Sequence, residues 1–131
     1  MTIQRHPRHQ ARIDDERTRW ARRAAIDAAR TTITVNATTT GLTGVSAAHI
    51  HVGGPTVASG GVIFSLFSAA DGAFTGAISK TLTSANLEAK PLEGVATFAD
   101  AVNAILAGNA YINVHTLPNF SGGEIRGQLK Q

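Results

Sequence analysis

Three histidines stand in sequence contexts that favour β-strands. His49 and His51 are two residues apart in the segment AAHIHVGG (residues 47–54), and His115 ends the alternating segment YINVH. Residues two apart on a strand point to the same face of a sheet, so His49 and His51 present their rings together. Imidazole nitrogens are good ligands for copper, zinc and nickel. His115 would supply a third ligand if its strand lay beside the first.

The same three histidines also have a purely structural interpretation. Each ring could be a half-buried polar group, hydrogen-bonded to the backbone or to Asn113, Thr116 or Glu124. The metal hypothesis instead takes all three rings as ligands of copper or zinc, with water or Glu124 in the fourth position. Two histidines at this spacing are a weak signal by themselves. The distances among the three rings decide between the two interpretations.

Three polar residues near the C-terminus could support such a site. Glu124 and Arg126, in the segment GEIRGQ, are two apart and could form a buried pair that orients a histidine. The alternative is a surface pair, which would contribute at most about 1 kcal/mol. Asn113 shares one face of its strand with Asn109 and Tyr111. That row is either a solvated polar face or a surface that contacts a ligand.

Other chemistries have no support in the composition or the motifs. The chain has no cysteine, which excludes disulfides and thiolate ligands. It has no GxSxG nucleophile motif and no phosphate-binding loop. The five acids after residue 30 are scattered, so no pair of carboxylates for glycoside hydrolysis is evident. We therefore expect no enzymatic activity, unless a copper ion at the histidines is redox-active.

The alternation of apolar residues predicts an all-β domain. A helix is expected near residues 97–107, with Thr97 as N-cap and Asp100 three residues on, because apolar residues there recur at helical spacing. The expected architecture is an antiparallel β-sandwich or flattened barrel, immunoglobulin-like or superoxide-dismutase-like. Its strands are predicted at residues 31–40, 45–52, 61–68, 73–82, 109–116 and 124–129.

Residues 1–30 differ from residues 31–131, and we take the two as separate segments. The first segment carries eight arginines and four acids, a charge of +4, whereas the second has four basic and five acidic residues, a charge of −1. Ala and Arg are good helix formers, so a helix over residues 14–30 is expected. It could be solvated, could dock through Ile13 and Trp20, or could act as a basic arm on nucleic acid or an anionic membrane. The balancing acids argue against nucleic acid.

Several sequence words together resemble the CHRD domain, the family named for the repeats of chordin. They are AHIH before a Gly/Pro-rich turn, then GNAYINVHT and GGEIRGQL, in that order, within residues 31–131. The resemblance implies a non-catalytic, extracellular binding or structural module, secreted or at the cell surface, with an unknown protein partner. The paired histidines are also similar to the His-x-His strand of copper/zinc superoxide dismutases, although the other ligands and the cysteines of those enzymes have no counterparts.

The resemblance also makes residues 1–30 unexpected. CHRD domains begin with one or two strands before the segment at residues 32–42, and no such strand is evident here. A sheet without its leading strands would expose an edge, and an exposed edge pairs readily with a second chain. We therefore expect a homodimer through that edge. Neither a secretory signal nor an apolar run long enough to span a membrane is visible in the sequence.

Overall fold

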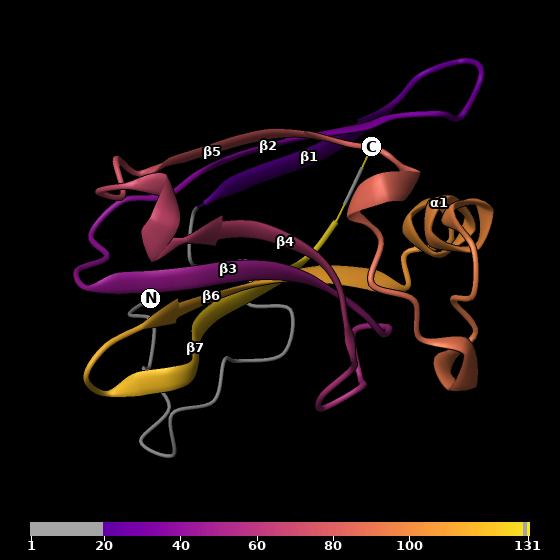
Figure 1. The fold of residues 1–131 in the computed structure, drawn as a ribbon. Helices are drawn as coiled ribbons and strands as arrows, with labels where there is room; N and C mark the ends of the chain where they lie inside the picture. Colours follow the sequence, from indigo (N-terminus) through magenta and orange to yellow (C-terminus); the bar gives the residue numbers. More distant parts are fainter. Residues whose placement is uncertain (1–19, 130) are drawn as a thin grey trace.

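The computed structural model describes residues 20–129 and 131, and its architecture is two antiparallel sheets packed face to face (Figure 1). The sheets are not joined into a closed barrel, so the sandwich is the correct form of the predicted all-β fold. The three-stranded sheet has the order β1-β2-β5, with bounds Ala21–Ile26, Ile33–Thr38 and Ala77–Leu82. The four-stranded sheet has the order β4-β3-β6-β7, with bounds Val62–Ser68, Val45–Val52, Ala110–Thr116 and Phe120–Gln128.

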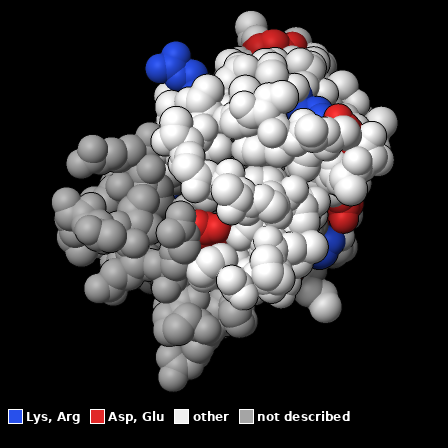
Figure 2. Space-filling model, turned by 90° about the vertical axis from the view of Figure 1, so that its left-hand side faces the viewer, with Lys and Arg blue, Asp and Glu red and all other residues white. Residues whose placement is uncertain are grey.

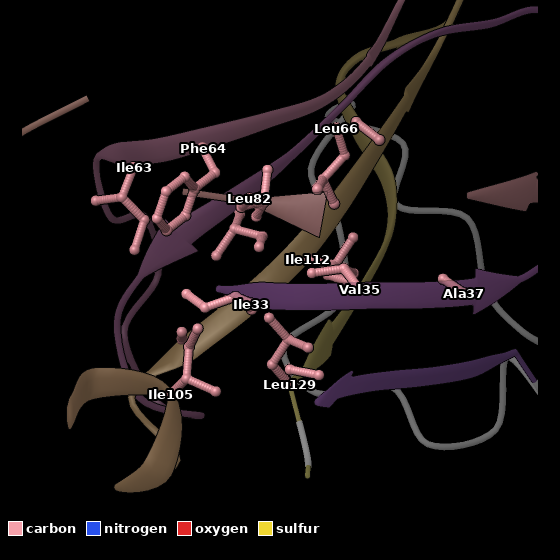
Figure 3. Close-up of a cluster of buried hydrophobic side chains, with 14 of the residues drawn as sticks. Ile33, Val35, Ala37, Ile63, Phe64, Leu66, Leu82, Ile105, Ile112 and Leu129 are labelled. Atoms are coloured by element: carbon pink, nitrogen blue, oxygen red, sulfur yellow. The ribbon is translucent and has the colours of Figure 1, made fainter. Parts of the chain in front are cut away.

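The core forms where the apolar faces of the two sheets meet (Figure 3). In β2, Ile33, Val35 and Ala37 are buried while Asn36 and Thr38 are exposed, which is the alternation expected of a strand with one solvated face. The other sheet and the helix complete this core with their own inward residues. These include Ile50, Ile63, Phe64, Leu66, Ile105, Ile112, Val114 and Leu129, and β5 adds Leu82 from the same sheet as β2.

One helix, α1 (Phe98–Leu106), closes an end of the sandwich as predicted. Thr97 Oγ1 accepts a hydrogen bond from the backbone N–H of Asp100, and the Asp100 carboxylate accepts one from the N–H of Thr97, so the capping box is present. Short 3-10 turns, η2 (Ala69–Asp71), η3 (Ser84–Asn86) and η4 (Pro91–Glu93), lie in the connections. No helix among the described residues is long and apolar enough to cross a membrane.

The predicted helix over residues 14–30 is wrong where the structure describes it. Ala21–Ile26 forms strand β1, which pairs with β2 over its whole length, from Ala21 opposite Thr38 to Ile26 opposite Ile33. Helix propensities differ by a few tenths of a kcal/mol per residue, whereas pairing with β2 also buries Ala24 completely in the core. Residues 1–19, with most of the expected arm, lie outside the described residues.

A tight turn after β1 explains why the strand ends where it does. The Asp27 carboxylate accepts hydrogen bonds from the backbone N–H groups of Thr31 and Thr32 and from the Thr31 hydroxyl. These bonds hold the pKa of Asp27 below its usual value, and Arg30 completes the turn with a positive φ of 58°. Strand β1 therefore covers the edge of β2 that we expected to be open. The homodimer stays a prediction, now without that particular edge.

Candidate metal centre

Strands β3 and β6 are neighbours, and their pairing brings the two histidine segments together. The register places Ala47 opposite His115, His49 opposite Asn113 and His51 opposite Tyr111. Ala48 and Ile50 point into the core, so the alternate residues His49 and His51 point to the outer face of the four-stranded sheet.

The three histidines form one cluster on that outer face. Each offers a ring nitrogen, and these three atoms all lie within 4.8 Å of one another. The shortest separation is 3.1 Å, between His49 Nδ1 and His115 Nε2. Ligand nitrogens on a tetrahedral zinc ion are about 3.3 Å apart, since each bond is about 2.0–2.1 Å. Side-chain rotations that move these nitrogens by about an ångström would therefore allow all three to bind one ion.

The backbone sets the protonation of two of these rings. His51 Nδ1 lies 2.8 Å from the carbonyl oxygen of Gly60, and His115 Nδ1 lies 2.8 Å from that of Ser121. A carbonyl only accepts, so each Nδ1 must carry a proton that it donates. In the neutral ring the Nε2 atom then has a free lone pair. This is the arrangement in which an outer hydrogen bond orients a metal-binding histidine.

The Nε2 lone pairs of His115 and His51 differ in their hydrogen-bond partners. His115 Nε2 accepts from His49 Nδ1, so His49 is protonated on Nδ1 in the metal-free protein. His51 Nε2 is buried, on a residue only 8% exposed, and has no hydrogen-bond partner among the described residues. Leaving a buried polar atom unsatisfied costs about 1–3 kcal/mol. A cation bound at the cluster would satisfy it and replace the proton shared by His49 and His115.

The surroundings favour neutral rings. Burial lowers the pKa of His49, and the nearby His115 and His51 lower it further, against a smaller opposing effect of Glu88. Burial also lowers the pKa of His51; the hydrogen bond to Gly60 opposes this, while His115 and Arg126 add to it. Metal ligation requires the unprotonated ring. The cluster is therefore ready to bind a cation at a lower pH than exposed histidines would be.

Behind His51 lies a column of stacked side chains. The Tyr111 ring is parallel to the His51 ring, with 4.9 Å between centroids and 6° between planes. The guanidinium carbon of Arg126 lies 3.5 Å from the centroid of the Tyr111 ring, which is close cation–π contact. The Tyr111 hydroxyl accepts a hydrogen bond of 2.8 Å from the backbone N–H of Gly60. Tyrosine and arginine thus fix the position of the His51 ring.

The segment after β3 covers this column, and we call residues 53–61 the covering loop. Arg126 Nη1 donates to the carbonyls of Val57 and Ala58, and Nη2 donates to that of Gly54. Gly60 approaches β3 so closely that a Cβ there would lie 1.6 Å from the Val52 carbonyl oxygen, so only glycine fits. Arg126 therefore anchors the loop that presents the Gly60 carbonyl to His51.

The other predicted support residues lie close by but act differently. Glu124 is buried and accepts a hydrogen bond of 2.8 Å from the Thr116 hydroxyl; it is not a member of the histidine cluster. Asn113 lies beside His49 in the register, and its amide nitrogen donates to the Gly122 carbonyl at 3.3 Å. Arg126 contacts Tyr111, which stacks on His51, and it contacts the covering loop; the expected orienting pair of Glu124 with Arg126 stays a prediction.

Some features of the site were not foreseen from the sequence. The carbonyls of Gly60 and Ser121 carry no sequence signal, because any residue has a carbonyl. Glu88 accepts a hydrogen bond of 3.1 Å from Ser65, the residue opposite His49 on strand β4. Glu93 accepts one of 2.9 Å from the N–H of Gly61. Both acids follow long connections, so only the folded chain places them near β3.

The described basic residues do not gather into one patch on the face in Figure 2, where acidic and basic groups alternate over a mostly uncharged surface. Arg22 has a structural role: its Nε donates to the Gln128 carbonyl at 2.9 Å, and its guanidinium lies over the Trp20 ring. A hollow of about 680 Å³ near these two residues is lined by strands β1, β2 and β5 and contains none of the three histidines.

The fold and the cluster define a class: an antiparallel β-sandwich module with a histidine cluster on the outer face of its larger sheet. The CHRD domain family model matches residues 23–129, most of the chain, and the chain belongs to this family. The match begins within β1, in agreement with the place of that strand in the sandwich. Neither a curated protein nor a solved structure matches the chain.

Proposed function

We propose that this chain is a non-catalytic module of extracellular type that binds a divalent transition-metal ion through His49, His51 and His115. The extracellular character and the role as a binding or structural module follow from the CHRD family. The metal is the more specific part of the proposal, and it depends on the geometry of the cluster. The ion would be copper or zinc, both of which bind neutral imidazole well.

The observation that carries the proposal is the buried, unpartnered Nε2 of His51, which lies in a cluster with two other ring nitrogens. Such atoms are uncommon, because buried polar groups are almost always paired. Within the described part of the chain, His51 Nε2 differs from the other buried unpartnered atoms of Trp20 and Asn113 because it belongs to a cluster of three ring nitrogens. The outer hydrogen bonds to Gly60 and Ser121 support the same conclusion, since they direct the Nε2 atoms of His51 and His115 toward the cluster.

The test is metal content and affinity. The full chain would be loaded with Zn(II) or Cu(II), desalted and measured by elemental analysis, and the affinity obtained by calorimetry or chelator competition. We expect one ion per chain, and loss of that ion in His51→Ala and His115→Ala. His6→Ala with His9→Ala, two histidines outside the described residues, is the matched control and should keep the ion. A stoichiometry near zero in the wild type, or loss only in the control, would contradict the proposal.

A further inference from the structure

We infer that the metal ion at this cluster keeps one coordination position open to solvent and accepts a carboxylate there, from a small acid or from the side chain of a binding partner. This inference rests on the proposed metal site. It concerns what the ion binds, and so it supplies chemistry for the partner that a binding module requires.

The first argument is the number of ligands. Zinc is commonly four-coordinate, and sites with three protein ligands leave the fourth position to water or an exogenous ligand. Within residues 20–129, the cluster contains three histidines and no cysteine, aspartate or glutamate. Glu124, the fourth ligand that the sequence suggested, accepts a hydrogen bond from Thr116 instead.

The second argument is the asymmetric burial of the site. His51 lies on the protein side, with Tyr111 stacked against it and the covering loop above Tyr111. His49 and His115 are only partly buried. Among the described residues, the column of aromatic and guanidinium groups therefore lies on one side of an ion held by all three, and the partly exposed rings of His49 and His115 lie on the other. The open position faces outward, where a group from another molecule can reach it.

The third argument is charge. Three neutral imidazoles leave the full double positive charge of the ion uncompensated in its immediate shell. The guanidinium of Arg126, one ring behind His51, adds positive charge on the protein side. An anionic oxygen donor is the ligand that this arrangement favours. Among the described acids, Glu88 acts electrostatically on His49 and Glu93 on His51. Glu88 is hydrogen-bonded to Ser65 and Glu93 to the N–H of Gly61.

Azide is the probe that reports an open position. It binds Cu(II) only where a coordination site is free, and it then produces a charge-transfer absorption band. The full chain loaded with one Cu(II) would be titrated with azide, and the azide then displaced with acetate or with the tripeptide Gly-Glu-Gly acetylated at its N-terminus and amidated at its C-terminus, whose sole carboxylate is the glutamate side chain. We expect a saturable band that both carboxylates diminish. If only acetate displaces the azide, the ligand is a small acid; if the peptide displaces it equally well, a protein side chain can serve.

A designed variant closes the position from within. Ala47 lies opposite His115 and shares the outer face with His49, so Ala47→His would add a fourth imidazole beside the other three. We expect this variant to hold Cu(II) more tightly and to lose the azide band. Thr34→His, which adds a histidine to the outer face of the other sheet, is the control and should keep the band.

The possible results separate the two proposals. Failure of the wild type to bind copper refutes the metal site itself. Copper binding without an azide band keeps the metal site and overturns the open position. A band that appears only in Glu88→Gln also overturns it, because Glu88 would then be the fourth ligand. Copper binding with a band that no carboxylate diminishes overturns the choice of ligand.

Discussion

The outer faces of the two sheets follow the same alternation yet have opposite environments. On the three-stranded sheet, Asn36 and Ser79 lie opposite each other and are exposed, and Thr34 pairs with Thr81 through their hydroxyls at 3.4 Å. The corresponding face of the four-stranded sheet is polar too, but most of it is buried, in part beneath the covering loop. Its members include Tyr111, Asn113, Arg126 and Gln128.

Burial changes what a polar side chain must do. A solvated threonine hydrogen-bonds to water, whereas a buried group needs a protein partner or costs free energy. Gln128 meets this need in full, since its amide nitrogen donates to the carbonyls of Gly53, Gly108 and Ala110. His51 does not, because its Nε2 is unpartnered. The comparison teaches that the candidate site lies where polar residues are buried and where atoms of His51 and Asn113 are left without a hydrogen-bond partner in the part of the chain that the structure describes.

The largest expected effect comes from removing the anchor of the covering loop. Arg126→Ala would leave the carbonyls of Gly54, Val57 and Ala58 without their hydrogen-bond donor. It would also leave a cavity where the Arg126 side chain, on a residue only 2% exposed, now packs. We expect the free energy of unfolding to fall by about 3 kcal/mol or more. Urea denaturation measures it. Arg23→Ala, on the exposed edge strand, should change it by less than about 0.5 kcal/mol. Equal effects of the two variants would show that the buried face is no different from the solvated one.

The second prediction separates stability from binding. His51→Phe keeps the stacking on Tyr111 and removes the unsatisfied Nε2, but it also removes the Nδ1–H bond to the Gly60 carbonyl. The two effects oppose each other, so the free energy of unfolding of the metal-free protein should change by no more than about 1 kcal/mol. Metal affinity should fall by more than the roughly 10–100-fold that loss of an outer hydrogen bond costs. Thermal melts with and without Zn(II) test both parts. A loss of more than about 3 kcal/mol without metal would exceed the cost of the lost bond to Gly60 and would mean that Nε2 also has a partner in the folded protein.

The third prediction concerns pH. The folded-state pKa values of His49 and His51 are lowered from 6.5, so the unfolded chain takes up protons before the folded one does. This contribution to stability is complete above pH 6.5 and is lost as the pH falls toward the lowered values. Metal affinity should decrease in the same direction. Unfolding in urea at a series of pH values tests this, and His49→Gln with His51→Phe should flatten the profile. An unchanged profile in that double variant would assign the pH dependence to other groups.

The smallest expected effect is the loss of one hydroxyl. Tyr111→Phe keeps the stack between His51 and Arg126 but removes the acceptor for the N–H of Gly60. We expect a loss of about 1 kcal/mol in the free energy of unfolding and a small decrease in metal affinity. Thr81→Ala removes a hydroxyl from the solvated face and should have almost no effect. If Thr81→Ala were as harmful as Tyr111→Phe, burial would not distinguish the two faces.

Much of the fold could be read from local patterns. The segment TTITVNATTT predicted a strand, and its central part is β2, because branched residues at alternate positions need one buried face. The capping pair Thr97 and Asp100 predicted the start of α1 for an equally local reason. The first strand was missed, because Arg and Ala favour a helix in isolation and only pairing with β2 makes Ala21–Ile26 extended.

The sequence by itself determined that His49 and His51 share a face and that His115 lies on a strand, since alternation depends only on position along the chain. Only the tertiary structure decided that His115 Nε2 lies 3.1 Å from His49 Nδ1. It also decided that hydrogen bonds to the carbonyls of Gly60 and Ser121 direct the Nε2 atoms of His51 and His115 toward the cluster. The reason is that His49 and His115 are 66 residues apart, so the register between β3 and β6 depends on the packing of the whole chain. The path of the covering loop over the sheet depends on that packing too.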